Sequence, residues 1–163
     1  MIITIVRHGE AADAHIDEDR ELTDSGLDDI SFGSHQLIGL CRDKSLTLPS
    51  HVAHSSWRRT TQSAEILEAA FQASIAPMPA LLPGSSLGDV DAALAALPSE
   101  LEHCVLVGHQ PMVSALVDYY LGDPGRVPPL SPGGYASISL ETPARGCGTL
   151  LFWALPPQYR AYV

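Results

Sequence analysis

The amino-acid sequence predicts an α/β protein, a three-layer α/β/α sandwich in which a mostly parallel central sheet is closed by a C-terminal antiparallel hairpin. Two patterns predict this class. Short apolar segments alternate with longer segments in which apolar residues recur at the helical period, as in strands joined by helices. The last two apolar segments are separated only by a turn, which is typical of a hairpin. The chain has 163 residues, and residues 1–163 are expected to form a single domain.

The first half of the chain is expected to contain two strands, each followed by a helix. Residues 2–6 are a β-branched run typical of a strand buried on both faces. Thr23 is placed to cap the first helix, and Pro49 precedes a short strand near residues 51–54. The second helix begins around residues 57–60. The positions that follow the helical period are Leu27, Ile30, Leu37, Ile38 and Cys41 in the first helix, and Thr60, Ala64, Leu67 and Phe71 in the second.

The segment that follows is less regular. Residues 75–78 are expected to form an edge strand, because Pro77 and Pro79 have no N–H to donate to a neighbouring strand. Residues 82–88 have the composition of a loop, and Asp89 is placed to cap a small helix. The apolar positions of that helix are Val90, Ala93, Leu94 and Leu97.

The last part of the chain contains the clearest interior strand and the closing hairpin. Residues 104–107 are continuously apolar and lead into a helix with Pro111 in its first turn. Residues 122–134 are rich in Pro and Gly and are expected to form an exposed loop near the mouth of a site. Residues 135–140 and 149–154 are expected to pair as the hairpin. The apolar stripe of the helix is Val113, Leu116, Val117 and Tyr120.

The charge and the cysteines limit the partners and the compartment of the protein. The formal net charge is −10, and Lys44 is the only lysine beside eight arginines. An acidic surface does not attract nucleic acid or anionic membranes, so neither is expected as a partner. No apolar stretch approaches the roughly 20 residues that cross a bilayer, and residues 2–6 are too short for a signal peptide. Three cysteines without a C-x-x-C pair fit a reducing compartment, and a cytoplasmic location is expected.

Three short segments place histidine, arginine and glycine where a strand is expected to end and a helix to begin. They are residues 7–9 (Arg-His-Gly), 55–63 (Ser-Ser-Trp-Arg-Arg-Thr-Thr-Gln-Ser) and 108–111 (Gly-His-Gln-Pro). In open parallel sheets, ligands bind at the edge where the carboxyl ends of the strands meet. The three segments are therefore expected to converge on one pocket.

The residue types of that pocket are those that bind a phosphoryl dianion. Arginine donates paired hydrogen bonds to phosphate oxygens, and a helix N-terminus behind Gln110 would add backbone N–H donors. A neutral imidazole can attack phosphorus and form a covalent intermediate that water resolves. Gly9 would let the backbone approach the ligand. Zinc is not expected, because the arginines would repel it and no Cys or carboxylate set completes a ligand shell. Ordinary core or surface roles are expected for His15, His35, His51, His54 and His103.

With these segments the sequence resembles the histidine phosphatase superfamily, also called phosphoglycerate mutase-like. The family has R-H-G after its first strand, a segment that reads roughly S-P-x-x-R-A-x-Q-T, and Gly-His or Ser-His after a hydrophobic strand. The matching residues are Arg7-His8-Gly9, then Ser55, Arg59 and Gln62, and finally Gly108-His109. The departures from the second motif are Ser56, Thr60 and Ser63, none of which removes a functional group that the chemistry needs. The spacing selects Arg59 over Arg58, which is expected to be exposed.

Within the superfamily the sequence is similar to the short SixA-type phosphohistidine phosphatases, which share its length and an R-x-L-T-x-x-G segment, here residues 20–26. The resemblance implies four catalytic residues: His8 as nucleophile, Arg7 and Arg59 as the phosphate clamp, and His109 as stabiliser of the transferring group. It also implies that Arg20 is a further pocket arginine, although a surface role near Asp17 and Asp19 is the alternative. Gln110 would contribute its backbone N–H. Neither a metal ion nor an organic cofactor is expected.

Two substrate classes differ in whether the enzyme needs a general acid, a group that protonates the leaving group. Mutases and broad-acid phosphatases of the superfamily carry an acidic residue near a W-E-G-like loop, whereas residues 83–89 offer only Asp89, which is interpreted as a helix cap. Phosphohistidine needs no strong acid, because its leaving imidazole has a conjugate-acid pKa of about 6.5. The resemblance therefore implies a phosphatase that acts on a histidine-phosphorylated protein, such as a phosphotransfer domain. A small-molecule phosphomonoesterase and a non-catalytic phosphate-binding protein are the alternatives.

Overall fold

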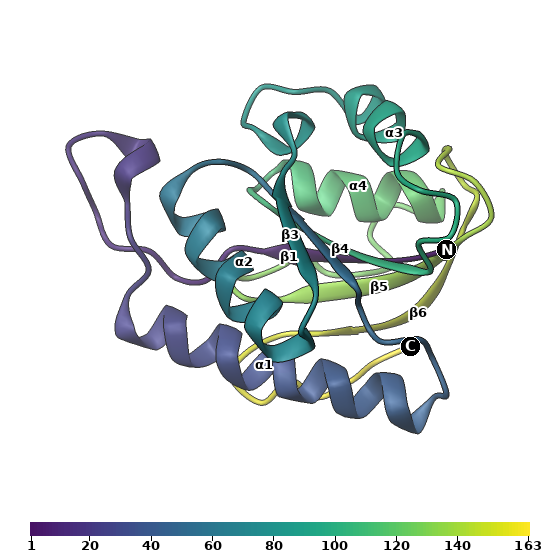
Figure 1. The fold of residues 1–163 in the computed structure, drawn as a ribbon, viewed down its shortest axis with the longest axis horizontal. Coiled ribbons are helices and arrows are strands. Elements are labelled where there is room, and N and C mark those ends of the chain that lie inside the picture. The colour runs from purple at the N-terminus through teal and green to yellow at the C-terminus, as the bar shows by residue number, and fades with distance from the viewer.

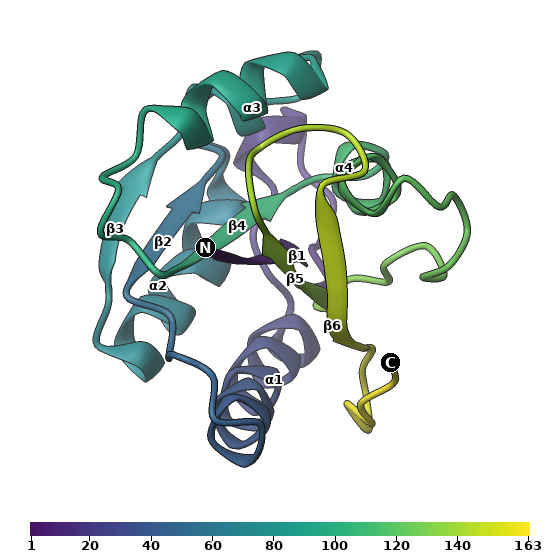
Figure 2. The same cartoon turned by 90° about the vertical axis from the view of Figure 1, so that its right-hand side faces the viewer.

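The computed structural model describes all 163 residues and consists of one six-stranded sheet between two layers of helices (Figures 1 and 2). The strand order is β3-β2-β4-β1-β5-β6. The strands are β1 (Ile2–Arg7), β2 (His51–His54), β3 (Ser74–Pro77), β4 (His103–Gly108), β5 (Tyr135–Leu140) and β6 (Gly148–Ala154). The pairings from β3 to β1 are parallel, and β5 is antiparallel to both β1 and β6. The predicted sandwich with its closing hairpin is therefore confirmed.

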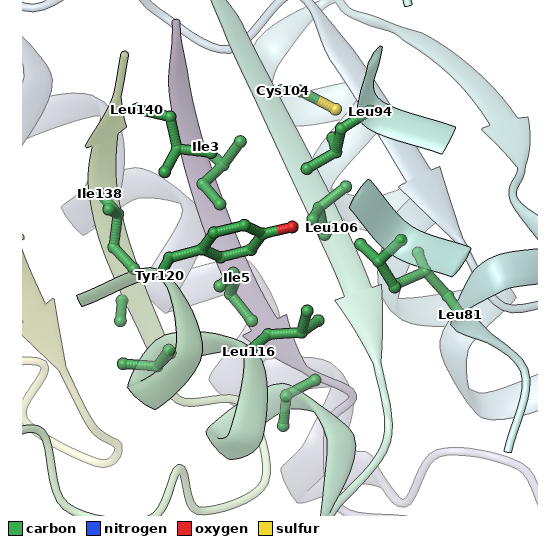
Figure 3. Close-up of a cluster of buried hydrophobic side chains, with 14 of the residues drawn as sticks. Ile3, Ile5, Leu81, Leu94, Cys104, Leu106, Leu116, Tyr120, Ile138 and Leu140 are labelled. Atoms are coloured by element: carbon green, nitrogen blue, oxygen red, sulfur yellow. The ribbon is translucent and has the colours of Figure 1, made fainter. Parts of the chain in front are cut away.

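Two helices cover each face of the sheet, as Figure 2 shows. The helices are α1 (Asp24–Asp43) and α2 (Arg58–Phe71) on one face, and α3 (Leu87–Ala95) and α4 (Met112–Leu121) on the other. Side chains of a strand alternate between its faces, so Ile3 and Ile5 pack with α3 and α4 whereas Val6 packs with α1 and α2. Each face of the sheet therefore has its own hydrophobic core. Figure 3 shows the core on the side of α3 and α4, with Tyr120 of α4 next to Ile3 and Ile5. None of the helices is long and apolar enough to span a membrane.

The sheet brings the three motif segments to one edge. β1 and β4 are parallel, with Arg7 opposite Gly108, and β2 lies on the other side of β4, with His54 opposite Val107. The carboxyl ends of three neighbouring strands therefore lie side by side. The residues that follow each strand meet there, although they are far apart in the sequence.

Two predicted details are wrong. Ser86, not Asp89, caps α3: the Ser86 hydroxyl accepts a hydrogen bond from the Asp89 N–H at 3.2 Å, and the Asp89 carboxylate accepts one from the Ser86 N–H at 2.7 Å. This reciprocal pair is a capping box, in which the acidic residue is the third of the helix. As a result α3 starts earlier and Leu97 lies beyond its end. The loop 122–134 is not fully exposed, because Val127 and Leu130 are buried in the core.

The C-terminal tail reaches back to the turn that follows β1. Tyr159 is buried, and its hydroxyl donates to the Gly133 carbonyl at 3.1 Å. The Gly133 N–H lies 3.1 Å from the Arg7 carbonyl and 3.0 Å from the His8 carbonyl. Gly133 has a φ of +81°, and a Cβ there would lie only 2.9 Å from the Tyr159 hydroxyl, so glycine suits this position. The tail thus helps to hold the turn that carries His8.

Candidate active site

A cavity of about 280 Å³ opens at the carboxyl edge of the sheet, where the three motif segments meet. Three arginines and two histidines dominate its lining. The lining residues are Arg7, His8, Glu10, Ala11, Arg20, Arg59, His109, Gln110 and Pro132. In a chain whose net charge is −10, three positive charges around so small a space favour a doubly charged anion. No group of three His, Cys, Asp or Glu side chains is arranged to hold a metal ion.

The imidazole of His8 is fixed in one orientation and one tautomer. Its Nδ1 lies 2.7 Å from the Gly9 carbonyl oxygen. A carbonyl oxygen only accepts hydrogen bonds, so Nδ1 carries the proton and Nε2 has the lone pair of the neutral ring. Nε2 accepts a hydrogen bond from Arg59 Nε at 3.1 Å. The lone pair of His8 therefore faces the guanidinium group of Arg59.

Both histidines of the cavity are held in the neutral form. Burial lowers the pKa of His8 to about 4. The charges of Arg59, Arg7 and Arg20 also lower the pKa, whereas the hydrogen bond to Gly9 raises it. Burial, together with the neighbouring His8 and Arg59, lowers the pKa of His109 to about 3. Both rings are therefore uncharged at neutral pH, which is the state in which an imidazole can act as a nucleophile.

Ser55 and Trp57 hold the ring of His109. Its Nε2 lies 2.8 Å from the hydroxyl of Ser55, which is completely buried. The Trp57 ring packs edge-on against it, with ring centroids 5.1 Å apart, and the His8 ring centroid is 5.3 Å away. His109 is only 4% exposed, yet its Nδ1 has no hydrogen-bond partner. Buried polar atoms without a partner are rare in proteins, and one on a cavity-lining residue is suited to a ligand.

The structure places Arg59, not Arg58, in the cavity, as the motif spacing predicted. The Arg59 side chain is 6% exposed, whereas that of Arg58 is 56% exposed and forms a surface salt bridge with Glu21 at 2.8 Å. Arg59 also donates to the backbone carbonyl of Asp17 at 2.6 Å and to its carboxylate at 3.3 Å. Its Cζ lies 4.8 Å from the Trp57 ring centroid, within cation–π range. The guanidinium group is therefore fixed by hydrogen bonds to His8 and Asp17 and by its contact with the Trp57 ring.

Arg20 lies at the rim of the cavity and supports a surface loop. It donates to the Ala11 carbonyl at 3.1 Å, to the Ala12 carbonyl at 2.9 Å and to the Asp17 carboxylate at 3.2 Å. The two roles that the sequence left open for Arg20 are thus compatible, because the residue lines the cavity and also braces residues 11–19.

Gly9 does not have the position that was predicted for it. It is absent from the cavity lining, and a Cβ on Gly9 would lie 2.8 Å from the Gly26 carbonyl oxygen, so its small size serves close packing against α1. The Gly9 N–H donates to Ser63 Oγ at 3.0 Å. Gln110 does line the cavity, and its backbone N–H has no acceptor within the protein. Its side chain donates to the Leu130 carbonyl at 2.9 Å and so fastens the loop 122–134.

Three residues around the cavity were missed by the sequence analysis. Glu10 directly follows the Arg-His-Gly motif, and Trp57 lies inside the second motif, so both had a positional signal. Asp17 had none, because it is one of three consecutive acidic residues in a short 3₁₀ turn. Burial opposes the ionisation of Asp17, but the hydrogen bonds and charges of Arg20 and Arg59 together outweigh it and lower the pKa of Asp17 overall.

The neutral histidines predict a loss of stability in acid. Below pH 6.5 the unfolded chain protonates His8 and His109 while the folded protein does not, so the free energy of unfolding falls as the pH drops from 6.5 toward 4. His8 alone would contribute about 2 kcal/mol of this loss between pH 7 and 4.5. Urea denaturation at both pH values measures it. His8→Gln should lose less stability on acidification than the wild type, and equal losses would contradict the assigned neutral state.

The fold of this chain is shared with solved structures of known proteins. No protein-family model and no curated protein sequence matches the chain. Among solved structures, the protein histidine phosphatase SixA in complex with tungstate is 28% identical, with a TM-score of 0.80 over 98% of this chain and 100% of that chain. A candidate phosphohistidine phosphatase SixA from Nakamurella multipartitia is 25% identical, with a TM-score of 0.77 over 96% of this chain and 97% of that chain. A mycobacterial glucosyl-3-phosphoglycerate phosphatase shares the fold at 18% identity, with a TM-score of 0.67 over 91% of this chain and 96% of that chain.

These similarities confirm the resemblance that the motifs indicated. The chain has the fold of the histidine phosphatase superfamily and is a phosphatase, a hydrolase that acts on a phosphoryl group. Within that superfamily it is similar to the SixA-type phosphohistidine phosphatases.

Proposed function

We propose that this protein removes the phosphoryl group from phosphohistidine on a protein substrate, through a covalent phosphohistidine at His8. The observation that carries the proposal is the neutral His8 ring, whose Nε2 lone pair faces Arg59 in a cavity lined by three arginines. This arrangement joins a nucleophile to an anion site, and a protein that only binds phosphate has no need of a nucleophile. The proposed catalytic residues are His8, Arg7, Arg59 and His109, and Arg20 and Gln110 are proposed to bind the substrate.

The cavity offers several donors that have no partner within the protein. Arg7 Nε and His109 Nδ1 are buried and unpaired, and the Gln110 N–H is free. In the tautomer that the proposed reaction uses, the Ser55 hydroxyl donates to His109 Nε2 and the ring proton is on Nδ1. These three donors suit phosphoryl oxygens. The tungstate bound in the similar SixA structure, an oxyanion like phosphate, supports this use of the cavity.

In the proposed reaction, the Nε2 lone pair of His8 attacks phosphorus as the P–N bond to the substrate imidazole breaks. The electron pair of that bond leaves with the imidazole, which takes a proton from solvent. Arg59 transfers its Nε hydrogen bond from His8 to a phosphoryl oxygen, and Arg7 and His109 stabilise the remaining oxygens. Water then attacks phospho-His8, inorganic phosphate leaves, and the lone pair returns to Nε2. The Gly9 carbonyl keeps its hydrogen bond to Nδ1–H and so stabilises the positive ring that phosphorylation creates.

The position of Asp89 favours a substrate with a good leaving group. The Asp89 carboxylate accepts hydrogen bonds from Ser86, lines no part of the cavity, and has a pKa lowered by those hydrogen bonds. It is therefore ionised at neutral pH, which is the wrong state for a general acid. Glu10 is the one carboxylate residue in the cavity lining, and it keeps a small-molecule phosphomonoesterase as the second candidate. Its carboxylate accepts a hydrogen bond from the Thr23 hydroxyl at 2.9 Å.

The assay that tests the proposal follows loss of label from a histidine-phosphorylated phosphotransfer domain and, in parallel, hydrolysis of sugar and nucleotide phosphates. We expect kcat/KM to be at least about 100-fold higher for the phosphohistidine domain, because an imidazole leaving group needs less assistance from an acid than an alkoxide does. Turnover of a phosphomonoester without any loss of label from the domain would contradict the proposal and favour the second candidate.

Two further features of the protein belong to this proposal. Residues 1–163 are proposed to act as one catalytic domain, because the two hydrophobic cores lie on opposite faces of a single sheet. The three cysteines are free, and Cys41 and Cys104 are buried, which favours a reducing compartment such as the cytoplasm.

A further inference from the structure

A second cavity, of about 370 Å³, adjoins the proposed phosphate site. The two cavities share His109 and Gln110, so the second cavity lies beside the phosphate site and is within reach of a substrate larger than phosphate. Its other lining residues come from the segment before and at the start of α3 and from the first turn of α4. They are Leu81, Pro83, Gly84, Ser85, Ser86, Leu87, Pro111, Met112 and Ala115.

The second cavity contains no group that carries a charge at neutral pH. Besides His109, its lining consists of apolar side chains, prolines, a glycine, two serines and Gln110. Its one titratable residue, His109, is neutral. A third cavity, on the Trp57 side of the site, differs in this respect, because its lining includes Glu18, Asp19 and Arg58. The surroundings of the phosphate site are therefore charged on one side and uncharged on the other.

The walls of the uncharged cavity are fixed in place. The capping box between Ser86 and Asp89 holds the start of α3. The Asp91 carboxylate accepts hydrogen bonds from Tyr119 at 2.6 Å and from the buried Tyr120 at 2.8 Å, which ties α3 to α4. The cavity is thus largely preformed, and a preformed site discriminates between ligands because it cannot adapt to an unsuitable one.

We propose that the cavity between Leu81 and Met112 is the subsite for the part of the substrate that departs from the phosphoryl group, and that it selects an uncharged, largely apolar segment of polypeptide around the phosphohistidine. The proposal rests on the proposed function and names the substrate class more closely. An anionic group placed here finds no cation, since the three arginines of the site line the phosphate cavity instead. Glutamate or aspartate next to the phosphohistidine, or a second phosphate on a metabolite, is therefore disfavoured.

The experiment uses two pairs of substrates. The first pair is two phosphohistidine peptides that differ only in leucine or glutamate beside the phosphorylated residue. The second pair is two nitrophenyl phosphates that differ only in a carboxylate on the ring, and it reports on the subsite even if phosphohistidine is not hydrolysed. For each pair the measured quantity is the ratio of kcat/KM for the uncharged substrate to kcat/KM for the charged one.

The variants place a lysine in the uncharged cavity or outside it. Met112→Lys and the exposed Pro83→Lys put a cation in the cavity lining, and the second variant guards against a folding defect in the first. Thr61→Lys puts the same charge in the Trp57-side cavity and serves as the matched control for a general attraction of anions. Met112→Leu keeps the lining uncharged.

We expect both cavity lysines to lower the ratio by about tenfold in each substrate pair, because each supplies the missing cation. Thr61→Lys and Met112→Leu should leave the ratio within about twofold of the wild type. Ratios that do not change in the cavity variants, or that change equally in Thr61→Lys, would overturn the subsite. Hydrolysis of the aryl phosphates with the expected ratios, but of neither peptide, would refute the phosphohistidine function and leave the subsite supported.

Discussion

Replacing His8 by alanine is expected to abolish turnover, with a loss on the order of 10⁴-fold or more in kcat. His8 is the only side chain in the cavity whose lone pair is both free of a proton and directed at an anion-binding group, so no neighbour can take over as nucleophile. The His109 ring is close, but its Nε2 is bonded to Ser55. Rapid quenching with ³²P-labelled substrate measures the loss directly, because it detects both turnover and the phosphoenzyme.

The control for this variant is His35→Ala, which removes an exposed imidazole on α1 and should leave kcat unchanged. The phosphoenzyme of the wild type should be labile in acid and stable in base, as a phosphoramidate is. Label that appears on another residue of the wild type, or turnover that persists in purified His8→Ala, would show that the nucleophile has been assigned wrongly.

Replacing Arg59 by methionine is expected to lower kcat/KM by about 10²- to 10³-fold. The guanidinium group is desolvated, and its Nε donor is already directed at the position where His8 meets the phosphoryl group. Methionine keeps the apolar stem against Trp57 but removes every donor. Steady-state kinetics and titration with tungstate, followed by calorimetry, should show weaker binding of the anion together with slower turnover.

Arg58→Met is the matched control, because Arg58 is the adjacent residue of α2 and loses the same charge and the same donors. Its side chain is exposed and engages Glu21, and surface ion pairs of this kind contribute between 0 and about 1 kcal/mol. We expect less than about a threefold change in kcat/KM for this variant. Similar losses in both variants would show that net charge near the cavity, and not the placement of Arg59, controls anion binding.

The sequence was sufficient for features that depend on local pattern. Thr23 caps α1 as predicted, accepting a hydrogen bond from the Gly26 N–H at 3.0 Å, because capping is decided within four residues. The placement of Arg59 in the cavity also followed from its spacing to Ser55 and Gln62 in the motif, and the structure has it buried and in the cavity lining. The convergence of the motifs followed from a general property of parallel sheets.

The features that sequence analysis missed depend on contacts between distant segments or on competition between neighbours. Asp17 meets Arg59 only because a surface loop folds over the N-terminus of α2, and no local signal encodes that contact. Ser86 and Asp89 are both good capping residues, and the choice between them depends on which start of α3 buries Val90 and Leu94. Gly9 was assigned to the ligand because its contact with α1 was not visible in the sequence.

The central place of β1 has a consequence for how the protein is made. β1 leaves the ribosome about 100 residues before β4, yet its two neighbours in the sheet are β4 and β5. At roughly 5–20 residues per second, β1 waits on the order of 5–20 s for β4, with both of its edges unpaired. The Tyr159 contact that holds the His8 turn can form only later still. The proposed nucleophile is thus translated well before the segments that complete its surroundings, and the nascent β1 has two unpaired edges that are open to aggregation in the meantime.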